Sequence, residues 1–184
     1  MKILLTGFKR YATHDVNPSE LLINQIEAAG VKKIVFDVSY AKSVEELKKA
    51  IRSFKPDFII SLGLSPFREE PTFEEYAYNE TKSIQPDEDG VLQNEGKALV
   101  EGGPKSLHCP IDLSRLQQVL AAQSISSSIS IDPGRFVCNA VYYNALASGI
   151  PAVFIHLPLI EDYPLADDLE AIRAVIEYVK GLKK

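Results

Sequence analysis

Three short hydrophobic runs divide the first third of the chain, at residues 2–6, 33–38 and 57–62. Each contains few polar positions and is bounded by glycine, proline or charged residues. Runs of this length and composition are typical of strands buried on both faces of a parallel sheet. We therefore predict three strands at these positions.

Two stretches with helical signals separate the three runs. The first begins at Asn17, an N-cap residue followed by proline, and extends to Gly30. The second carries a capping-box pattern from Ser43 to Glu46 and stops before Pro56. The alternation of strand and helix predicts a parallel sheet with right-handed crossovers.

The middle of the chain is an irregular stretch. Residues 65–110 are rich in proline, glycine and acidic residues, with one alternating segment, TFEEYAYN, that fits a strand. Regular signals then resume, in the order helix DLSRLQQVLAAQ, strand 127–131, a helix from the DPG turn to Gly149, strand AVFIHLP and helix LADDLEAIRAVIEYVKGL. We expect one domain over residues 1–184, a three-layer α/β/α fold with a mostly parallel central sheet and an irregular mid-chain insertion.

Composition excludes several classes of function. The net charge is −5 and the basic residues are dispersed, so the electrostatic footprint of a nucleic-acid-binding protein is missing. The N-terminal apolar run is too short for a signal peptide or a membrane span, which predicts a cytoplasmic protein with no membrane partner. The two cysteines, Cys109 and Cys138, form neither a disulfide framework nor a metal-binding spacing.

Cys138 is the first candidate for chemistry. It lies near the start of the helix that follows the DPG turn, where the carboxyl edge of a parallel sheet places its ligands. Unpaired amide N–H groups and the helix dipole there would lower the pKa of the thiol and bind an oxyanion. A cysteine on an apolar helix is, however, more often a small buried side chain. Position alone leaves both interpretations open.

A base for this thiol would come from one of three histidines. His156 ends the AVFI run, so it lies at the carboxyl end of the strand directly after the Cys138 helix. His14 lies in a polar loop, and His108 stands beside Cys109, so neither makes a better partner. A histidine at a strand end can also be an ordinary core residue.

A carboxylate would orient the imidazole. Alternation along TFEEYAYN puts Glu74 and Glu75 on opposite faces, so one of them can point inward. Both would be solvated if the segment is an exposed edge.

Six segments in chain order resemble those of the cysteine-type pyroglutamyl peptidases, also called pyrrolidone-carboxylate peptidases. They are LLTGFKRY followed by NPSE, SLGLSP, TFEEYAYN, VEGGP, GRFVCN and FIHLP. Six ordered matches through most of the chain are far more specific than a single motif.

The resemblance implies a thiol exopeptidase that hydrolyses the amide bond after an N-terminal pyroglutamyl residue, through a thioester. Carried over residue by residue, it makes Cys138 the nucleophile, His156 the general base and acid, and Glu74 the carboxylate that orients His156. It implies no metal or organic cofactor, and it implies pyroglutamylated peptides as partners. It also implies a cytoplasmic homo-oligomer, commonly a homotetramer.

The same resemblance implies a pocket for the five-membered lactam. Phe8 and Tyr11 would sandwich the ring, and Phe136 and Val137 would complete the apolar wall. Without the resemblance, Phe8 and Tyr11 would be ordinary loop-packing residues.

Two stretches depart from the family pattern. The family usually reads Asp-Ala-Arg-Ile-Pro-Asp-Asn where residues 82–88 read KSIQPDE, so Ile84 occupies the place of an arginine near the active site. Its role could pass to Arg68 or Lys82. The N-terminal loop has Lys9-Arg10 for an acidic residue and a proline, and Ala12-Thr13 for Gly-Gly.

These departures leave room for a second interpretation, a non-catalytic relative that binds a lactam or a small peptide. In such a protein Cys138 would be inert. A flavodoxin-like binder is less favoured, because the turn TGFKRY lacks a phosphate-cradling glycine pattern.

Overall fold

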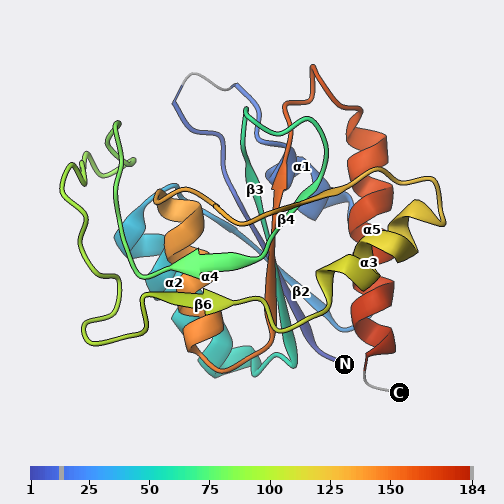
Figure 1. The fold of residues 1–184 in the computed structure, drawn as a ribbon, viewed down its shortest axis with the longest axis horizontal. Coiled ribbons are helices and arrows are strands. Elements are labelled where there is room, and N and C mark those ends of the chain that lie inside the picture. Colours follow the sequence, from blue (N-terminus) through green and yellow to red (C-terminus); the bar gives the residue numbers. More distant parts are fainter. Residues whose placement is uncertain (13–14, 183–184) are drawn as a thin grey trace.

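A six-stranded sheet forms the centre of the protein, in the order β2-β1-β3-β8-β4-β7 (Figure 1). The computed structural model describes residues 1–12 and 15–182. Strands β2, β1, β3 and β8 are parallel, β4 is antiparallel to β8, and β7 is parallel to β4. The strands span β1 (Ile3–Phe8), β2 (Val31–Phe36), β3 (Phe58–Leu64), β4 (Thr72–Glu74), β7 (Ser128–Ser130) and β8 (Ala152–Leu157). The mostly parallel sheet predicted from the sequence is confirmed.

Helices cover both faces of this sheet. One face carries α1 (Pro18–Gln25), α3 (Leu113–Ala121) and α5 (Leu165–Gly181), and the other carries α2 (Tyr40–Phe54) and α4 (Val137–Ala147) (Figure 1). Alternation along the strands builds a separate apolar core on each face. In β8, Val153 and Ile155 pack on the α5 side, whereas Ala152 and Phe154 pack on the α4 side. The three-layer α/β/α architecture is therefore confirmed.

The segment TFEEYAYN forms two strands in different sheets rather than one. After β4, Glu75 donates its backbone N–H to Ser130 O (2.7 Å), while its carbonyl accepts from Cys109 N (2.8 Å). The chain thus changes partners at Glu75. Beyond it, β5 (Tyr76–Tyr78) pairs with β6 (Ser106–His108) in a two-stranded antiparallel sheet that contacts α4.

Two helix boundaries differ from the predictions. Helix α1 ends at Gln25, well before Gly30, because the next residue, Ile26, adopts an extended conformation and is buried in the core. Helix α2 begins earlier than expected, because Ser39 is its N-cap and accepts a hydrogen bond from Lys42 N (3.1 Å). Ser43 lies within the helix, where its hydroxyl donates to Ser39 O (2.6 Å).

No helix in residues 1–12 and 15–182 is long and apolar enough to cross a membrane. Thr13 and His14, which figured in the sequence predictions, lie outside the described residues.

Candidate active site

Cys138 is the second residue of α4 and lies above the carboxyl end of β3. The DPG turn after β7 leads into this helix, with Gly134 at a φ of 75° that favours glycine. A Cβ atom on Gly63 would lie 2.8 Å from the Cys138 sulfur and 2.8 Å from the Phe154 ring. The absence of a side chain at Gly63 therefore gives the thiol its place against the sheet.

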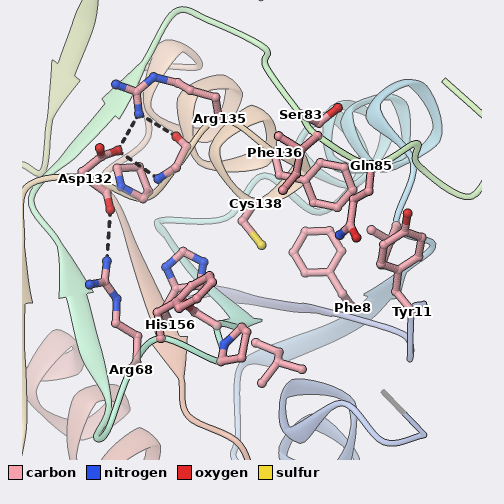
Figure 2. A pocket seen from close by; sticks show the side chains of 18 of the residues that line it. Phe8, Tyr11, Arg68, Ser83, Gln85, Asp132, Arg135, Phe136, Cys138 and His156 are labelled. Carbon is pink, nitrogen blue, oxygen red and sulfur yellow. Dashed lines mark hydrogen bonds and ion pairs between the residues drawn. The ribbon is translucent and has the colours of Figure 1, made fainter. Parts of the chain in front are cut away.

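His156 lies beside this position. It is the register partner of Gly63 between β3 and β8, and neighbouring strands are about 4.8 Å apart. Alternation along β8 puts His156 on the same face as Phe154, the face that α4 covers. Figure 2 shows the sulfur and the imidazole on one wall of a shared cavity. The structure thus brings together the two residues that element order had predicted to be neighbours.

Glu74 completes a chain of three groups. It is fully buried in β4, and its Oε1 lies 2.7 Å from His156 Nδ1. Because a carboxylate only accepts hydrogen bonds, Nδ1 carries the proton and Nε2 is left unprotonated in the neutral ring. Glu75, the other candidate, is partly exposed and lies 3.2 Å from His108 Nε2. The inward-pointing glutamate is Glu74.

Arg68, in the loop after β3, forms an ion pair with Glu74. One guanidinium nitrogen donates to Glu74 Oε1 (2.9 Å), to Ser130 Oγ (2.7 Å) and to Asp132 O (3.0 Å). Figure 2 shows the link from Arg68 to Asp132, in the loop that leads to Cys138. At the position of the family's usual arginine, Ile84 is fully exposed. Of Arg68 and Lys82, the two residues predicted to take over the role of this arginine, Arg68 is the one with a hydrogen bond to Glu74.

The resting state of Cys138 differs from the sequence prediction. Burial, and then the negative charge of Glu74, raise the pKa of the Cys138 thiol to about 12. The predicted lowering by the helix N-terminus is therefore wrong, because desolvation outweighs the dipole at this position. The thiol is neutral near pH 7, and it needs a base before it can act as a nucleophile.

The chain is similar to known peptidases in sequence and in fold. It matches the family model of pyroglutamyl peptidase over residues 1–179. This chain belongs to the pyroglutamyl peptidase family. The pyrrolidone-carboxylate peptidase of Coprothermobacter proteolyticus is 33% identical over 194 residues, covering 99% of this chain and 93% of the relative.

A crystal structure of pyrrolidone carboxyl peptidase from Fervidobacterium islandicum superposes with a TM-score of 0.91 at 26% identity, covering 98% of this chain and 99% of that one. The Pyrococcus furiosus enzyme superposes with a TM-score of 0.89 at 28% identity, covering 97% of each chain. These similarities confirm the fold and the family that the six sequence segments had indicated.

In this member of the pyroglutamyl peptidase family, the cavity beside Cys138 has a volume of about 770 Å³. Phe8, Tyr11 and Phe136 line it, as the resemblance implied, and the Tyr11 and Phe136 ring centroids are 5.7 Å apart. In Figure 2, Phe8 and Tyr11 lie on the other side of the sulfur from His156. Val137 does not line the cavity, because its side chain is fully buried in the core beneath α4.

Sequence reasoning missed some residues around the cavity. Tyr40 packs edge-on against Phe136, at 5.5 Å between ring centroids, and its hydroxyl donates to Arg135 O (3.1 Å). Gln85 projects into the cavity near Phe8 (Figure 2). No local pattern marks either residue. Within the described residues, no cluster of three or more histidine, cysteine or acidic side chains is arranged to hold a metal ion.

Proposed function

We propose that this protein is a cysteine exopeptidase that removes an N-terminal pyroglutamyl residue from peptides. The arrangement that carries the proposal is the Cys138 thiol beside His156, which is paired at 2.7 Å with the buried Glu74, at the edge of an aromatic cavity. Membership of the pyroglutamyl peptidase family supports the substrate class.

In the first half of the reaction, His156 Nε2 takes the proton of the Cys138 thiol as the sulfur attacks the pyroglutamyl carbonyl carbon. The raised pKa of Cys138 makes this transfer part of the chemical step rather than a resting ion pair. Backbone N–H groups at the start of α4, where no side chain caps the helix, stabilise the resulting oxyanion.

Collapse of this intermediate breaks the carbon–nitrogen bond. The His156 imidazolium returns its proton to the leaving amine, and a thioester to Cys138 remains. Water then attacks the thioester carbonyl, giving a proton to His156, and the carbon–sulfur bond breaks. Proton return to sulfur releases pyroglutamic acid and restores the thiol. Glu74 holds Nδ1 protonated throughout and stabilises the transient imidazolium.

The aromatic cavity accounts for selectivity. A lactam ring carries no charge, so it can enter the space between Phe8, Tyr11 and Phe136 without desolvating an ion. A free N-terminal ammonium would lose its hydration there, and no carboxylate lines the aromatic part of the cavity among the described residues. A blocked, uncharged N-terminus is therefore preferred.

The direct test is the release of a fluorescent amine from a pyroglutamyl amide by wild type, Cys138→Ala and Cys109→Ala. Cys109 is the matched control because it is a buried thiol in the other core. We expect loss of activity only in Cys138→Ala, with no release from the free glutamyl amide. A wild-type protein that binds the lactam without releasing amine would point instead to a non-catalytic binding protein.

The assembly and compartment of the protein are further parts of this proposal. Val91 and Leu92 are large apolar side chains that are about two-fifths exposed, which suits an interface between copies of the chain in a homotetramer. The reaction needs Cys138 reduced, which suits the cytoplasm. Analytical ultracentrifugation of wild type and Leu92→Glu would test the assembly, and fractionation of the cells of origin would test the compartment.

A further inference from the structure

The chain segment around Gln85 is fixed against the rest of the cavity. Its backbone and neighbouring side chains contact the N-terminal loop, the start of α2, the loop before α4 and the segment near residue 93. These contacts are Tyr11 hydroxyl to Pro86 O, Tyr40 N to Asp87 Oδ2 (2.9 Å), Lys82 N to Arg135 O (2.9 Å) and Ser83 N to Gln93 O (2.8 Å). The position of Gln85 is therefore determined by its neighbours, and only its side chain is free to adjust.

The Gln85 side chain ends in the aromatic part of the cavity. Figure 2 shows its amide group beside the Phe8 ring, between that ring and Tyr11. Gln85 is an exposed residue, and within residues 1–12 and 15–182 no group hydrogen-bonds to its side-chain amide. Phe8, Tyr11 and Phe136 present mainly ring surfaces here, so Gln85 brings a donor and an acceptor together at this wall.

We infer that Gln85 recognises the lactam group of the substrate through its side-chain amide, an inference that rests on the proposed function. A five-membered lactam holds its N–H and C=O on the same side of the ring. A primary amide offers the complementary pair, a carbonyl oxygen that accepts and an NH₂ group that donates. Two parallel hydrogen bonds can then form while the rings of Phe8 and Tyr11 contact the faces of the lactam.

The size of the expected effect is modest. A neutral hydrogen bond contributes little net free energy because the same groups bond to water when apart, so we expect the pair to change the affinity roughly tenfold. The family pattern has isoleucine at the place of Gln85, so Gln85 adds polar recognition to a slot that shape already favours. Because the lactam does not react, the contact is the same in substrate and transition state, and its loss raises KM rather than lowering kcat.

The first experiment compares Gln85→Leu with wild type on the fluorescent pyroglutamyl amide. Gln118→Leu is the matched control, since it makes the same substitution at an exposed position of α3, outside the cavity. We expect KM to rise about tenfold in Gln85→Leu with kcat changed less than about twofold, and the control to behave as wild type. Unchanged KM in Gln85→Leu would overturn the inference.

A second experiment does not depend on turnover. NMR titration of Cys138→Ala with 2-pyrrolidone and with cyclopentanone, which keeps the carbonyl but lacks the N–H, measures lactam recognition alone. We expect a preference for 2-pyrrolidone that shrinks severalfold when Gln85→Leu is added. The same preference in both backgrounds would refute the role of Gln85.

The two experiments also separate this inference from the proposed function. If wild type hydrolyses the amide and Gln85→Leu has no effect in either experiment, the proposed peptidase activity holds and the role of Gln85 in lactam recognition is refuted. If wild type releases no amine but lactam binding still depends on Gln85, the role of Gln85 in recognition holds and the proposed peptidase activity is refuted.

Discussion

Glu74 and Asp168 are both fully buried carboxyl groups, and they lie on opposite faces of the central sheet. Glu74, on the α4 side, has His156 Nδ1 and an Arg68 guanidinium nitrogen within 2.9 Å of one carboxylate oxygen. Asp168, in the first turns of α5, has no hydrogen-bond partner for either oxygen among the described residues. The two carboxyl groups are thus equally buried but differ in whether they have hydrogen-bond partners.

The difference shows what a partner does for a buried acid. Arg68 and His156 offset the desolvation of Glu74, so its charge can serve to orient the imidazole. For Asp168, desolvation, and then the charge of Asp167, raise the pKa to about 7. One buried acid is built into the site by its neighbours, whereas the other destabilises the fold whenever it ionises.

Of the substitutions that test this comparison, we expect the largest effect on activity at Glu74. In Glu74→Gln the side-chain size is kept, but the charge that holds Nδ1 protonated and stabilises the imidazolium is lost. We expect kcat/KM for the pyroglutamyl amide to fall about 10³-fold. Glu75→Gln is the matched control, because Glu75 is the partly exposed neighbour whose contact is His108. A loss below tenfold in Glu74→Gln would mean that His156 needs no orienting carboxylate.

Removing Asp168 is expected to stabilise the protein at high pH. With a folded pKa of about 7, above the unfolded value near 4, the native state binds more protons between these values. Stability therefore falls as pH rises from about 4 to 7, and the full penalty, about 4 kcal/mol, applies above pH 7. At pH 8, urea unfolding should give Asp168→Leu a free energy of unfolding that exceeds the wild-type value by about this penalty.

The same unfolding series contains its own control. The advantage of Asp168→Leu should shrink at pH 4.5, where the native carboxyl group is protonated. Asp167→Leu, at the exposed neighbouring position, should change stability by about 0.5 kcal/mol or less. An advantage of Asp168→Leu that does not vary with pH would show that packing, rather than charge, limits stability at this position.

The sequence predicted the neighbours Cys138 and His156 because both follow from the order of strands and helices. It left Glu74 and Glu75 open because alternation assigns opposite faces but not which face is buried. The change of partners at Glu75 depends on Ser130 and Cys109, both distant in sequence. Local patterns carry no information on such long-range contacts.

Errors at the helix ends and in the thiol pKa have a related cause. Ser39 and Ser43 are both capable N-caps, and the tertiary hydrogen bond that the Ser39 hydroxyl donates to Asp89 Oδ2 (2.6 Å) favours Ser39. The pKa of Cys138 reflects the balance of a local helix dipole against burial of the thiol between α4 and the sheet and the charge of Glu74. Only the dipole can be inferred from the sequence, and it is the smaller effect at this position.

Arg68 offers the smallest and most specific test of the comparison, because removing it makes Glu74 more like Asp168. Without the guanidinium, Glu74 Oε1 loses one of its two hydrogen-bond donors, so the carboxylate is held less firmly against His156 Nδ1. We expect kcat at pH 7 to fall about 10- to 100-fold in Arg68→Met, with partial rescue in Arg68→Lys. Arg115→Met, at an exposed position of α3, controls for loss of a positive charge.

Comparing Arg68→Met with Arg68→Lys distinguishes positioning from simple loss of stability. Urea unfolding measures the stability of both variants, and kcat is compared under conditions in which both remain folded. Arg68 also bonds to Ser130 and Asp132, so loosening of the loop before α4 would lower kcat in both variants alike. Equal kcat in the two folded variants would therefore assign Arg68 to the loop that positions Cys138, rather than to the Glu74 carboxylate.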